Sequence, residues 1–440
     1  MKTFNLRRVV AVGLAGICLA TLRRCVLHLQ YSTTTQITGG SGNCEHDKKM
    51  AQSESLWGMV VGDALSMPVH WYYDPDDIRR DYGDWLSGFV APKTRHPSSI
   101  LTISAVGGAG RSGYGSGSDP VIGSVILHDK LKYWQSNQRS IHYHQGMKAG
   151  DSTLNALVAG LTAQTLASEY QDQQPMDDGA YGAIFAAYVK FMTTPGSHGD
   201  TYAESFHREF FRDWLTAGSP VVSEEVLAFA ESRSKKLTSS HVDHNIDSIG
   251  ALVMPISVIL HCANLSTTEA VKHAVRLVNL THCSLSLVPF VELYATTLHS
   301  VVNGASLREK AQAALESPLL GGSNTWKRVK KYSQLAARYA EGSEERLQVY
   351  QEAVSHFGLA CYIKGAVTSM FFLAYEFHDN FEAGALTNTN CGGENCHRGA
   401  ALGALLGAEA GRNGREIPQQ FKSGIHSAQE TIQDVIEAWK

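Results

Sequence analysis

The sequence predicts an all-α fold with few short strands, and three observations support this prediction. From about Ser53 onward, apolar residues recur mostly at helical spacing. Capping signals precede several of the predicted helices. Strands and helices do not alternate along the chain, which argues against a parallel doubly wound sheet. With 440 residues, the chain is long enough to bury a large core.

The first 44 residues differ from the rest of the chain. Residues 9–22 form an apolar run with two arginines on each side. As a helix this run would measure about 21 Å, which is short of the roughly 30 Å hydrocarbon core of a membrane. A signal peptide, a short anchor or an organelle presequence fits this pattern, and a surface helix is the alternative. We predict a targeting or anchor segment with its linker over residues 1–44, able to associate with a membrane, and a single domain over residues 45–440.

The charge of the predicted domain argues against nucleic-acid binding. Residues 1–44 hold five of the 38 Lys and Arg residues and none of the 42 Asp and Glu residues, so the remainder carries a net charge of −9. An acidic surface does not attract a phosphate backbone.

Helix signals follow in order along the domain. A helix begins near Leu154, whose apolar residues share one face. Ser266 with Glu269, and Ser427 with Glu430, predict capped helix starts. Residues 359–377 predict a buried helix. Two short strands are predicted at residues 100–106 and 121–127.

Glycines recur at every fourth position in residues 398–411, at Gly399, Gly403, Gly407 and Gly411. On a helix they would share nearly one face. Because glycine costs about 1 kcal/mol per helical position relative to alanine, this face predicts the close approach of a second helix.

A first candidate site stretch, residues 62–71, contains Asp63 and His70. A buried carboxylate needs partners, so Asp63 either caps a neighbouring segment or supports a site. His70 lies beside Trp71 and either lines a pocket or is structural.

A second stretch carries Asp151, Ser152 and Thr153 at the start of the Leu154 helix. These residues cap the helix, or they hold a hard cation or a sugar hydroxyl.

A third stretch, residues 388–399, is a polar loop with a Gly392–Gly393 turn. Cys391, Cys396 and His397 match no standard zinc spacing. The remaining cysteines are widely spread, and buried free thiols explain them best. The glycine-rich residues 107–117 either cradle phosphate or form a mobile loop.

Together, the segments GDALSMPVHWYYDP, YHQGMKAGDSTLNA and NTNCGGENCHRGAALGALLGA resemble the ADP-ribosylglycohydrolase family, and within it the jellyfish J-crystallin branch. The resemblance covers roughly residues 53–418. It implies a helical orthogonal bundle around a central cleft, hydrolysis of a glycosidic bond to ADP-ribose on a protein or small acceptor, and a binuclear Mg²⁺ centre.

The resemblance also implies roles for residues at matching positions. Asp151, Thr153 and Glu394 would be metal ligands. His70 stands where some members have a catalytic Glu, so His70, supported by Asp63, is the expected acid–base residue. Gly392, Gly393, Asn395 and His397 would contact the substrate.

The sequence departs from the family pattern at several of these positions. Members usually have Asp-Asp-Thr where this chain has Asp151-Ser152-Thr153, and Gly-Gly-Asp-x-Asp-Thr where it has residues 392–397. Only two matched carboxylates remain for the four charges of two Mg²⁺ ions, so one Mg²⁺ or none is expected. The hypotheses are therefore an ADP-ribosyl hydrolase, or a catalytically impaired ADP-ribose-binding or crystallin-like structural protein.

Overall fold

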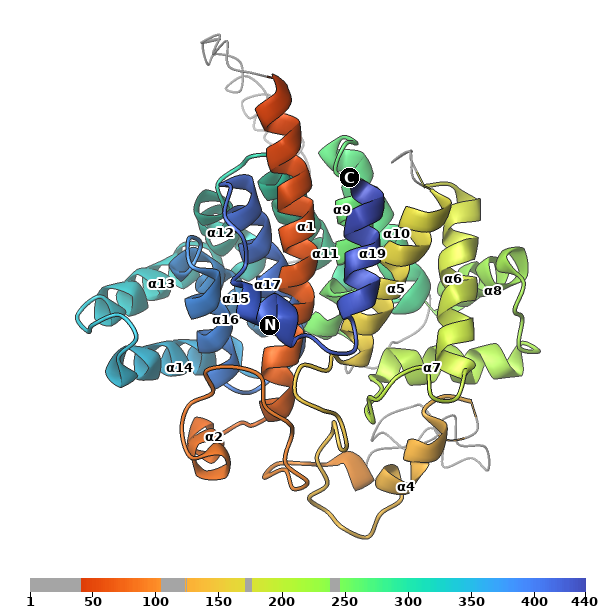
Figure 1. Cartoon of the computed structure of the whole chain (residues 1–440), viewed down its shortest axis with the longest axis horizontal. Helices are drawn as coiled ribbons and strands as arrows, with labels where there is room; N and C mark the ends of the chain where they lie inside the picture. Colours follow the sequence, from red (N-terminus) through yellow and green to blue (C-terminus); the bar gives the residue numbers. More distant parts are fainter. Residues whose placement is uncertain (1–40, 104–122, 124, 171–175, 238–245) are drawn as a thin grey trace, which may run out of the picture. The chain divides into compact units, whose positions relative to one another are not determined.

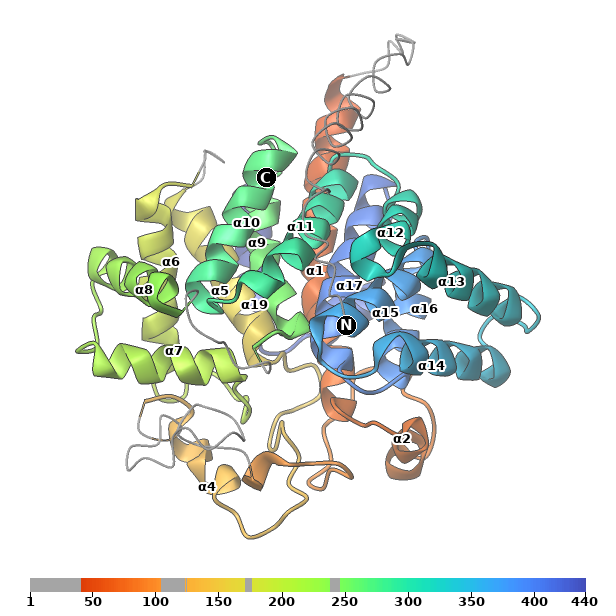
Figure 2. The same cartoon turned by 180° about the vertical axis from the view of Figure 1, so that it is seen from behind.

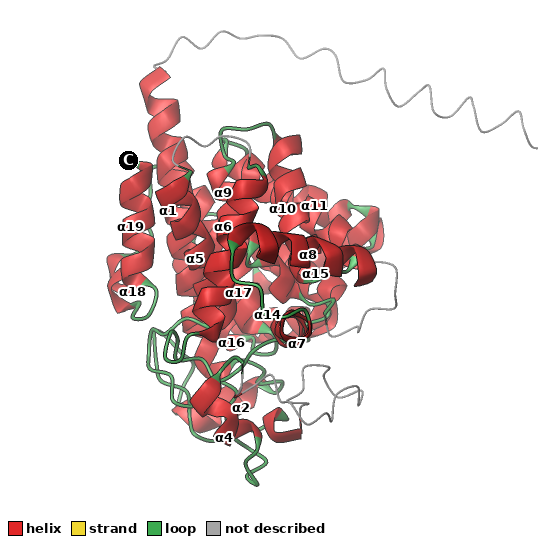
Figure 3. Ribbon diagram, turned by 90° about the vertical axis from the view of Figure 1, so that its right-hand side faces the viewer, coloured by secondary structure: helices red, strands yellow, loops and turns green. Residues whose placement is uncertain are grey.

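The computed structural model describes residues 41–103, 123, 125–170, 176–237 and 246–440. In these residues all regular structure is helical, which confirms the predicted fold class (Figure 3). The predicted targeting run at residues 9–22 and the glycine-rich residues 107–117 lie outside the described residues. The chain divides into Met1–Cys44 and Glu45–Lys440, and the following description concerns the second unit together with the helix that enters it.

The helices are seen in chain order in Figures 1 and 2. The helices before residue 240 are α1 (Ser41–Ser66), α2 (Pro75–Tyr82), α4 (Leu131–Trp134), α5 (Leu154–Glu169), α6 (Asp178–Thr193), α7 (Ser205–Thr216) and α8 (Ser223–Leu237). Those that follow are α9 (Pro255–His261), α10 (Thr267–Thr281), α11 (Val288–Val302), α12 (Leu307–Glu316), α13 (Gly322–Ala336), α14 (Glu344–Gly358), α15 (Ile363–Glu376), α16 (Phe381–Asn390), α17 (Asn395–Arg412), α18 (Gln419–Gly424) and α19 (Gln429–Trp439).

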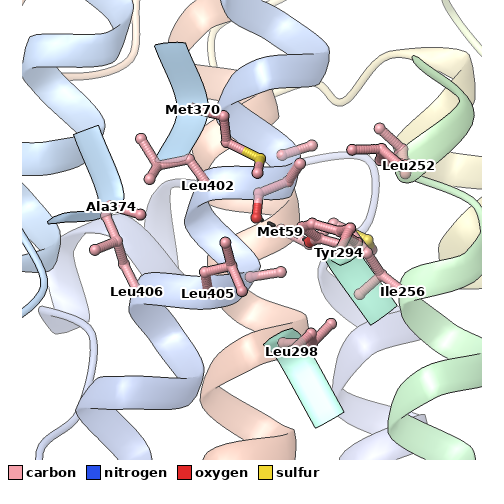
Figure 4. Close-up of a cluster of buried hydrophobic side chains, with 14 of the residues drawn as sticks. Met59, Leu252, Ile256, Tyr294, Leu298, Met370, Ala374, Leu402, Leu405 and Leu406 are labelled. Atoms are coloured by element: carbon pink, nitrogen blue, oxygen red, sulfur yellow. Dashed lines mark hydrogen bonds between the residues drawn. The ribbon is translucent and has the colours of Figure 1, made fainter. Parts of the chain in front are cut away.

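Two large apolar clusters form most of the core of the described residues. The larger cluster includes residues of α1, α9, α11 and every helix from α12 through α17. Figure 4 shows Met59, Tyr294, Met370 and Leu402 packed within it. The Tyr294 hydroxyl donates to the carbonyl of Ala401, so its polar end is satisfied inside this core. The second cluster is rich in aromatic residues and lies mainly among α5 to α8 and α10.

The predicted close helix approach is confirmed. Facing glycines of α1 and α17 lie in antiparallel register, because a Cβ on Gly403 would lie 2.0 Å from the Gly58 carbonyl oxygen, and one on Gly399 would lie 2.5 Å from that of Gly62. Gly407 and Gly411 meet the backbone of Glu54 and Met50 in the same way. We call this contact the glycine seam. No side chain fits between the two backbones at these four positions, so the glycine seam fixes the position of α17 against α1.

The predicted helix starts had different outcomes. The Ser266 side chain accepts from the amide of Glu269, which confirms the first predicted cap. The second was wrong: α19 begins at Gln429, and the Ser427 hydroxyl accepts from the amide of Ser152 instead. A long-range partner therefore replaces the local one.

The strand prediction was also wrong where it can be examined. Leu101–Ile103 form a 3-10 helix, and among the described residues of the second predicted strand Ile126 makes an isolated β-bridge and no strand. The predicted buried helix is confirmed as α15, whose residues are mostly buried. Leu285–Val302 is apolar and long enough to span a membrane, but 56% of it is buried in the core, as expected for a core helix.

Candidate functional site

The first and third candidate stretches are joined by their backbones. The Trp71 amide donates to the Gly393 carbonyl at 2.8 Å, and the Gly393 amide donates to the Tyr72 carbonyl at 2.6 Å. Gly392 and Gly393 both have φ of +64°, and a Cβ on Gly392 would lie 2.3 Å from the Tyr72 oxygen. The turn therefore requires glycine for its backbone conformation and for this close approach.

Asp63 joins all three stretches. Its carboxylate accepts from the amide and the hydroxyl of Thr153, both at 2.7 Å, and from the Cys396 thiol at 3.1 Å. Asp63 therefore bonds, from outside α5, to the amide and the hydroxyl of the residue that precedes this helix. The supporting role in catalysis predicted for Asp63 stays a prediction. Because α1 and α17 are in contact along the glycine seam, the positions of Asp63 and Cys396 are fixed relative to each other.

Glu394 lies at the centre of the joined stretches and is fully buried. His70 Nε2 lies 3.0 Å from its Oε1, and the Trp71 indole donates to its Oε2. His397 Nδ1 lies 2.7 Å from Oε1 in an ion-pair contact. Nitrogen groups thus surround both carboxylate oxygens.

A chain of polar contacts continues from His70. Its Nδ1 lies 2.8 Å from His144 Nε2, and His144 Nδ1 lies 2.7 Å from the carboxylate of Asp200. Asp200 also accepts from the amides of Leu154 and Tyr202, at 2.9 and 3.0 Å. Asp200 thus caps α5 and is the last residue in this series of polar contacts.

The carboxylate of Glu204 also faces His397, with its Oε1 3.7 Å from the same Nδ1 atom that Glu394 contacts. Asn155 donates to Glu204 at 2.6 Å and Ser248 donates at 3.2 Å. We call the six residues the histidine–carboxylate cluster: His70, His144, Asp200, Glu204, Glu394 and His397.

The protonation of the cluster follows from burial and from these neighbours. Burial would raise the pKa of Glu394, but His70 and His397 outweigh it and hold the pKa well below its usual value. Burial raises the pKa of Glu204. Burial lowers the pKa of His70 to about 3, whereas Glu204 and Glu394 overcome burial at His397 and raise its pKa to about 10. The pKa values of the two carboxyl groups are therefore shifted in opposite directions.

Aromatic rings border the cluster. Trp71 packs edge-on against Tyr143 and Tyr202, with centroid distances of 4.5 and 4.8 Å. Two large aromatic side chains nearby are exposed. Tyr73 is 44% exposed and follows Tyr72, whose carbonyl accepts from the Gly393 amide. Tyr362 is 54% exposed and forms a backbone bridge with Ser248. A planar ligand reaching the cluster from this side would meet aromatic faces.

The structure places the remaining predicted residues as follows. The Asp151 carboxylate accepts from the Lys148 amide at 2.7 Å and contacts the His426 ring at 2.8 Å. Neither of these two contacts joins Asp151 to Glu394. Thr153 reaches the third stretch only through Asp63. The amides of Gly392 and Gly393 bond to backbone carbonyls.

Asn395 lies at the start of α17 and is fully buried. Its amide nitrogen donates to Thr389, and its Oδ1 has no hydrogen-bond partner. The substrate-contacting role predicted for it, and for Gly392, Gly393 and His397, stays a prediction.

Sequence reasoning missed Asp200, Glu204 and the role of His144. Asp200 lies in the polar, turn-rich segment between α6 and α7. A signal was present, since two carboxylates four residues apart immediately precede an amphipathic helix, α7. Nothing in the sequence indicated that this turn would reach Glu394.

The cluster does not fit the Mg²⁺ that the family resemblance implies. Mg²⁺ requires about six hard oxygen ligands. Here Thr153 is committed to Asp63, the oxygens of Glu394 face nitrogen groups, and Asp151 is bonded elsewhere. The atoms that do converge within 4.8 Å of one another belong to His70, Glu394 and His397, two imidazoles and one carboxylate.

These features define an all-α protein whose buried polar site is assembled from loops at helix ends. The family model described as ADP-ribosylglycohydrolase matches residues 53–439, so the chain belongs to the ADP-ribosylglycohydrolase family. This family is typically metal-dependent and acts on ADP-ribosylated substrates.

Among solved structures, an ADP-ribosylglycohydrolase-related protein complex is similar at 15% identity, with 89% of this chain and 98% of that chain covered and a TM-score of 0.45. No curated protein sequence matches the chain. The resemblance to the jellyfish J-crystallin branch stays a prediction.

Proposed function

We propose that the chain is a hydrolase that cleaves a glycosidic bond to ADP-ribose, with the histidine–carboxylate cluster as its catalytic centre. One observation carries the proposal: segments far apart in sequence meet in one buried cluster, in which the carboxylates of Glu204 and Glu394 both lie beside the His397 imidazole. Family membership supports a hydrolase-like activity.

The two carboxylates suit different parts of glycosidic hydrolysis. This chemistry commonly pairs a carboxyl group that moves a proton with an ionised carboxylate, around an oxocarbenium-like transition state. Glu204, with its raised pKa, would protonate the leaving group as the bond to the anomeric carbon breaks. Glu394, held ionised, would stabilise the positive charge that develops. Water then adds to the anomeric carbon, and its proton returns to Glu204.

His70 has a different role in this proposal from the one expected from the sequence. Both of its ring nitrogens are engaged, one by Glu394 and one by His144, and its exposed fraction is 0%. We therefore assign His70 as a residue that positions Glu394. Asp63, whose carboxylate holds Thr153 and Cys396, positions the three stretches.

The exposed aromatic residues suggest where the nucleotide part binds. Tyr73 and Tyr362 offer ring faces on which an adenine could stack. Because the exposed fractions of His70 and Glu394 are zero, the proposal requires side chains above the cluster to move when a ligand binds.

The test measures release of ADP-ribose by the full chain from modified arginine, modified serine and small acceptors. We expect Glu204→Gln to lower turnover about 100-fold or more. Glu376→Gln is the matched control, because Glu376 is another carboxylate whose pKa is raised by burial, and it lies on α15 with Ser333 and Tyr350 as partners. A folded chain that releases ADP-ribose from none of these substrates contradicts the proposal.

The second candidate is a non-catalytic ADP-ribose-binding or crystallin-like structural protein. The complete burial of Glu394 and the engagement of both its oxygens favour this alternative. Saturable binding of ADP-ribose without turnover would support a binding protein. Neither binding nor turnover by a folded chain would support a structural one.

A further inference from the structure

We infer that His70, Glu394 and His397 form a binding site for a borderline divalent transition metal ion such as Zn²⁺, in place of the Mg²⁺ typical of the family. The inference does not rest on the proposed hydrolysis, because a protein without activity could hold the same ion. It starts from three side chains that the fold brings together around one point.

The chain differs from the pattern of the family it resembles at all three positions: some members have a Glu at the position of His70, and Asp and Thr are usual at the positions of Glu394 and His397. The fold brings them together, with ligand atoms of all three within 4.8 Å of one another. Two of the three side chains are imidazoles, which suit Zn²⁺ and similar ions and not Mg²⁺.

The distances suit a small ion. Glu394 Oε1 lies 3.0 Å from His70 Nε2 and 2.7 Å from His397 Nδ1. Neighbouring ligands of a tetrahedral Zn²⁺ lie about 3.3 Å apart, since Zn–N and Zn–O bonds are about 2.0 Å. Small outward shifts of these side chains would therefore admit the ion.

His397 Nδ1 is the third ligand atom. It is buried, with its side chain 3% exposed, and lies 2.7 Å from Glu394 Oε1 in an ion-pair contact. Coordination requires this imidazole to release its proton, and the metal ion would then supply the positive charge between the two groups. Glu204, 3.7 Å away, is the nearest further oxygen donor.

Hydrogen-bond counting around His70 gives an independent argument. The contacts Asp200–His144, His144–His70 and His70–Glu394 each require one proton. Two neutral imidazoles supply only two. A metal ion bound at His70 Nε2 makes the third proton unnecessary, because that nitrogen then donates its lone pair to the ion and needs no proton toward Glu394.

The remaining contacts are those expected of the surroundings of a metal. A ligating imidazole usually passes its other N–H to a neighbour that fixes the ring, and here His144 and then Asp200 fill that place. The Trp71 indole donates to the second oxygen of Glu394, leaving Oε1 to face the ion. Buried negative charge on Glu394 would be compensated by the ion.

The test uses the full chain, stripped with a chelator and then dialysed against Zn²⁺ or Mg²⁺ separately. We expect about one equivalent of Zn²⁺ and no retained Mg²⁺ by elemental analysis. Zn²⁺ and not Mg²⁺ should raise the melting temperature. Co²⁺ should give a visible absorption band of a site with nitrogen and oxygen ligands.

Two variants and a control locate the ion. His397→Thr, which restores the usual family residue, and Glu394→Gln should each weaken Zn²⁺ binding at least tenfold while the far-ultraviolet circular dichroism is unchanged. His261→Gln is the matched control, because His261 is a buried imidazole whose Nε2 also lacks a partner but which belongs to no ligand group in the described part of the chain.

The readouts separate this inference from the proposed function. Equal Zn²⁺ retention by the wild type and His397→Thr overturns the inference, as does retention of Mg²⁺ in place of Zn²⁺. If the folded chain retains neither ion, an additional proton makes the third hydrogen bond and the site is metal-free. This result also overturns the inference. Hydrolysis without Zn²⁺ would leave the proposed function standing while the metal inference fails.

Discussion

The glycine seam and the histidine–carboxylate cluster lie at successive positions of α17, yet they are built in opposite ways. The seam brings two backbones together with no side chain between them, as at Gly58 and Gly403. The cluster fills the space beyond the seam with charged and imidazole side chains that bond to one another. The seam contributes stability, whereas the cluster places carboxylates where burial alone disfavours their charge. The comparison indicates that the first region supports the geometry of the second.

The largest expected effect is in the seam. Gly403→Ala should lower the free energy of unfolding by more than about 3 kcal/mol, because its Cβ would lie 2.0 Å from the Gly58 oxygen and the two helices must separate. Intrinsic helix propensity would favour the alanine by about 1 kcal/mol, so the sign of the effect is decided by packing. Urea denaturation measures the difference.

Gly160→Ala is the matched control for the seam. Gly160 lies inside α5, and its added Cβ would lie 3.6 Å from the nearest atom, the Thr431 methyl, in ordinary contact. We expect a change within about 1 kcal/mol, in the stabilising direction. Equal losses at positions 160 and 403 would show that the seam has no special role.

The next effect concerns buried histidines. Burial lowers the pKa of His142, His207 and His282 below 6.5, to about 3 for His282. Their neutral forms are thus favoured in the folded state. As pH falls below about 6.5, the unfolded chain binds more protons, and stability should fall by about 1.4 kcal/mol per pH unit for each such ring.

Urea midpoints between pH 7.5 and 4.5 test this expectation. His282→Gln should reduce the dependence of stability on pH by the contribution of one buried histidine. His46→Gln, at an exposed position, should leave this pH dependence unchanged. A midpoint that is flat over this range would show that these rings are not buried in the neutral form.

A smaller effect is expected where Asp63 joins the stretches. Asp63→Ala leaves the Thr153 amide and hydroxyl unpaired in a buried place, which should cost about 1–3 kcal/mol. Asp74→Ala removes an exposed helix cap and should cost about 1 kcal/mol. Equal costs would mean that Asp63 acts only as an ordinary cap. Thermal and urea unfolding of both variants make the comparison.

The smallest effect is at a local cap. Ser266→Ala should cost about 1 kcal/mol, because the Glu269 amide loses its acceptor. Ser423→Ala, an exposed serine within α18, should change stability by less than about 0.5 kcal/mol. A neutral Ser266→Ala variant, measured by urea denaturation beside this control, would show that the cap contributes nothing.

Local, periodic features were predictable from the sequence. The glycine face, the Ser266 cap and the helix starting at Leu154 each depend on residues a few positions apart. The Ser427 cap failed because the amide of Ser152, far away in sequence, took the serine oxygen.

The site was only half predictable for the same reason. Asp63, His70 and Glu394 could be named because they lie in recognisable motifs. Asp200 and Glu204 could not, since their contacts with His144 and His397 exist only after α5, α7 and α17 have packed. The cluster is therefore a product of topology more than of any single motif.

The most direct test of the account is calorimetric titration of the full chain with ADP-ribose, after loading with Zn²⁺. If distant stretches converge on a working nucleotide-sugar site, the wild type should bind one ADP-ribose per chain and Glu394→Gln should lose binding, while Glu376→Gln keeps it. A folded wild-type chain that takes up no ADP-ribose, or a Glu394→Gln variant that binds equally well, would contradict the account.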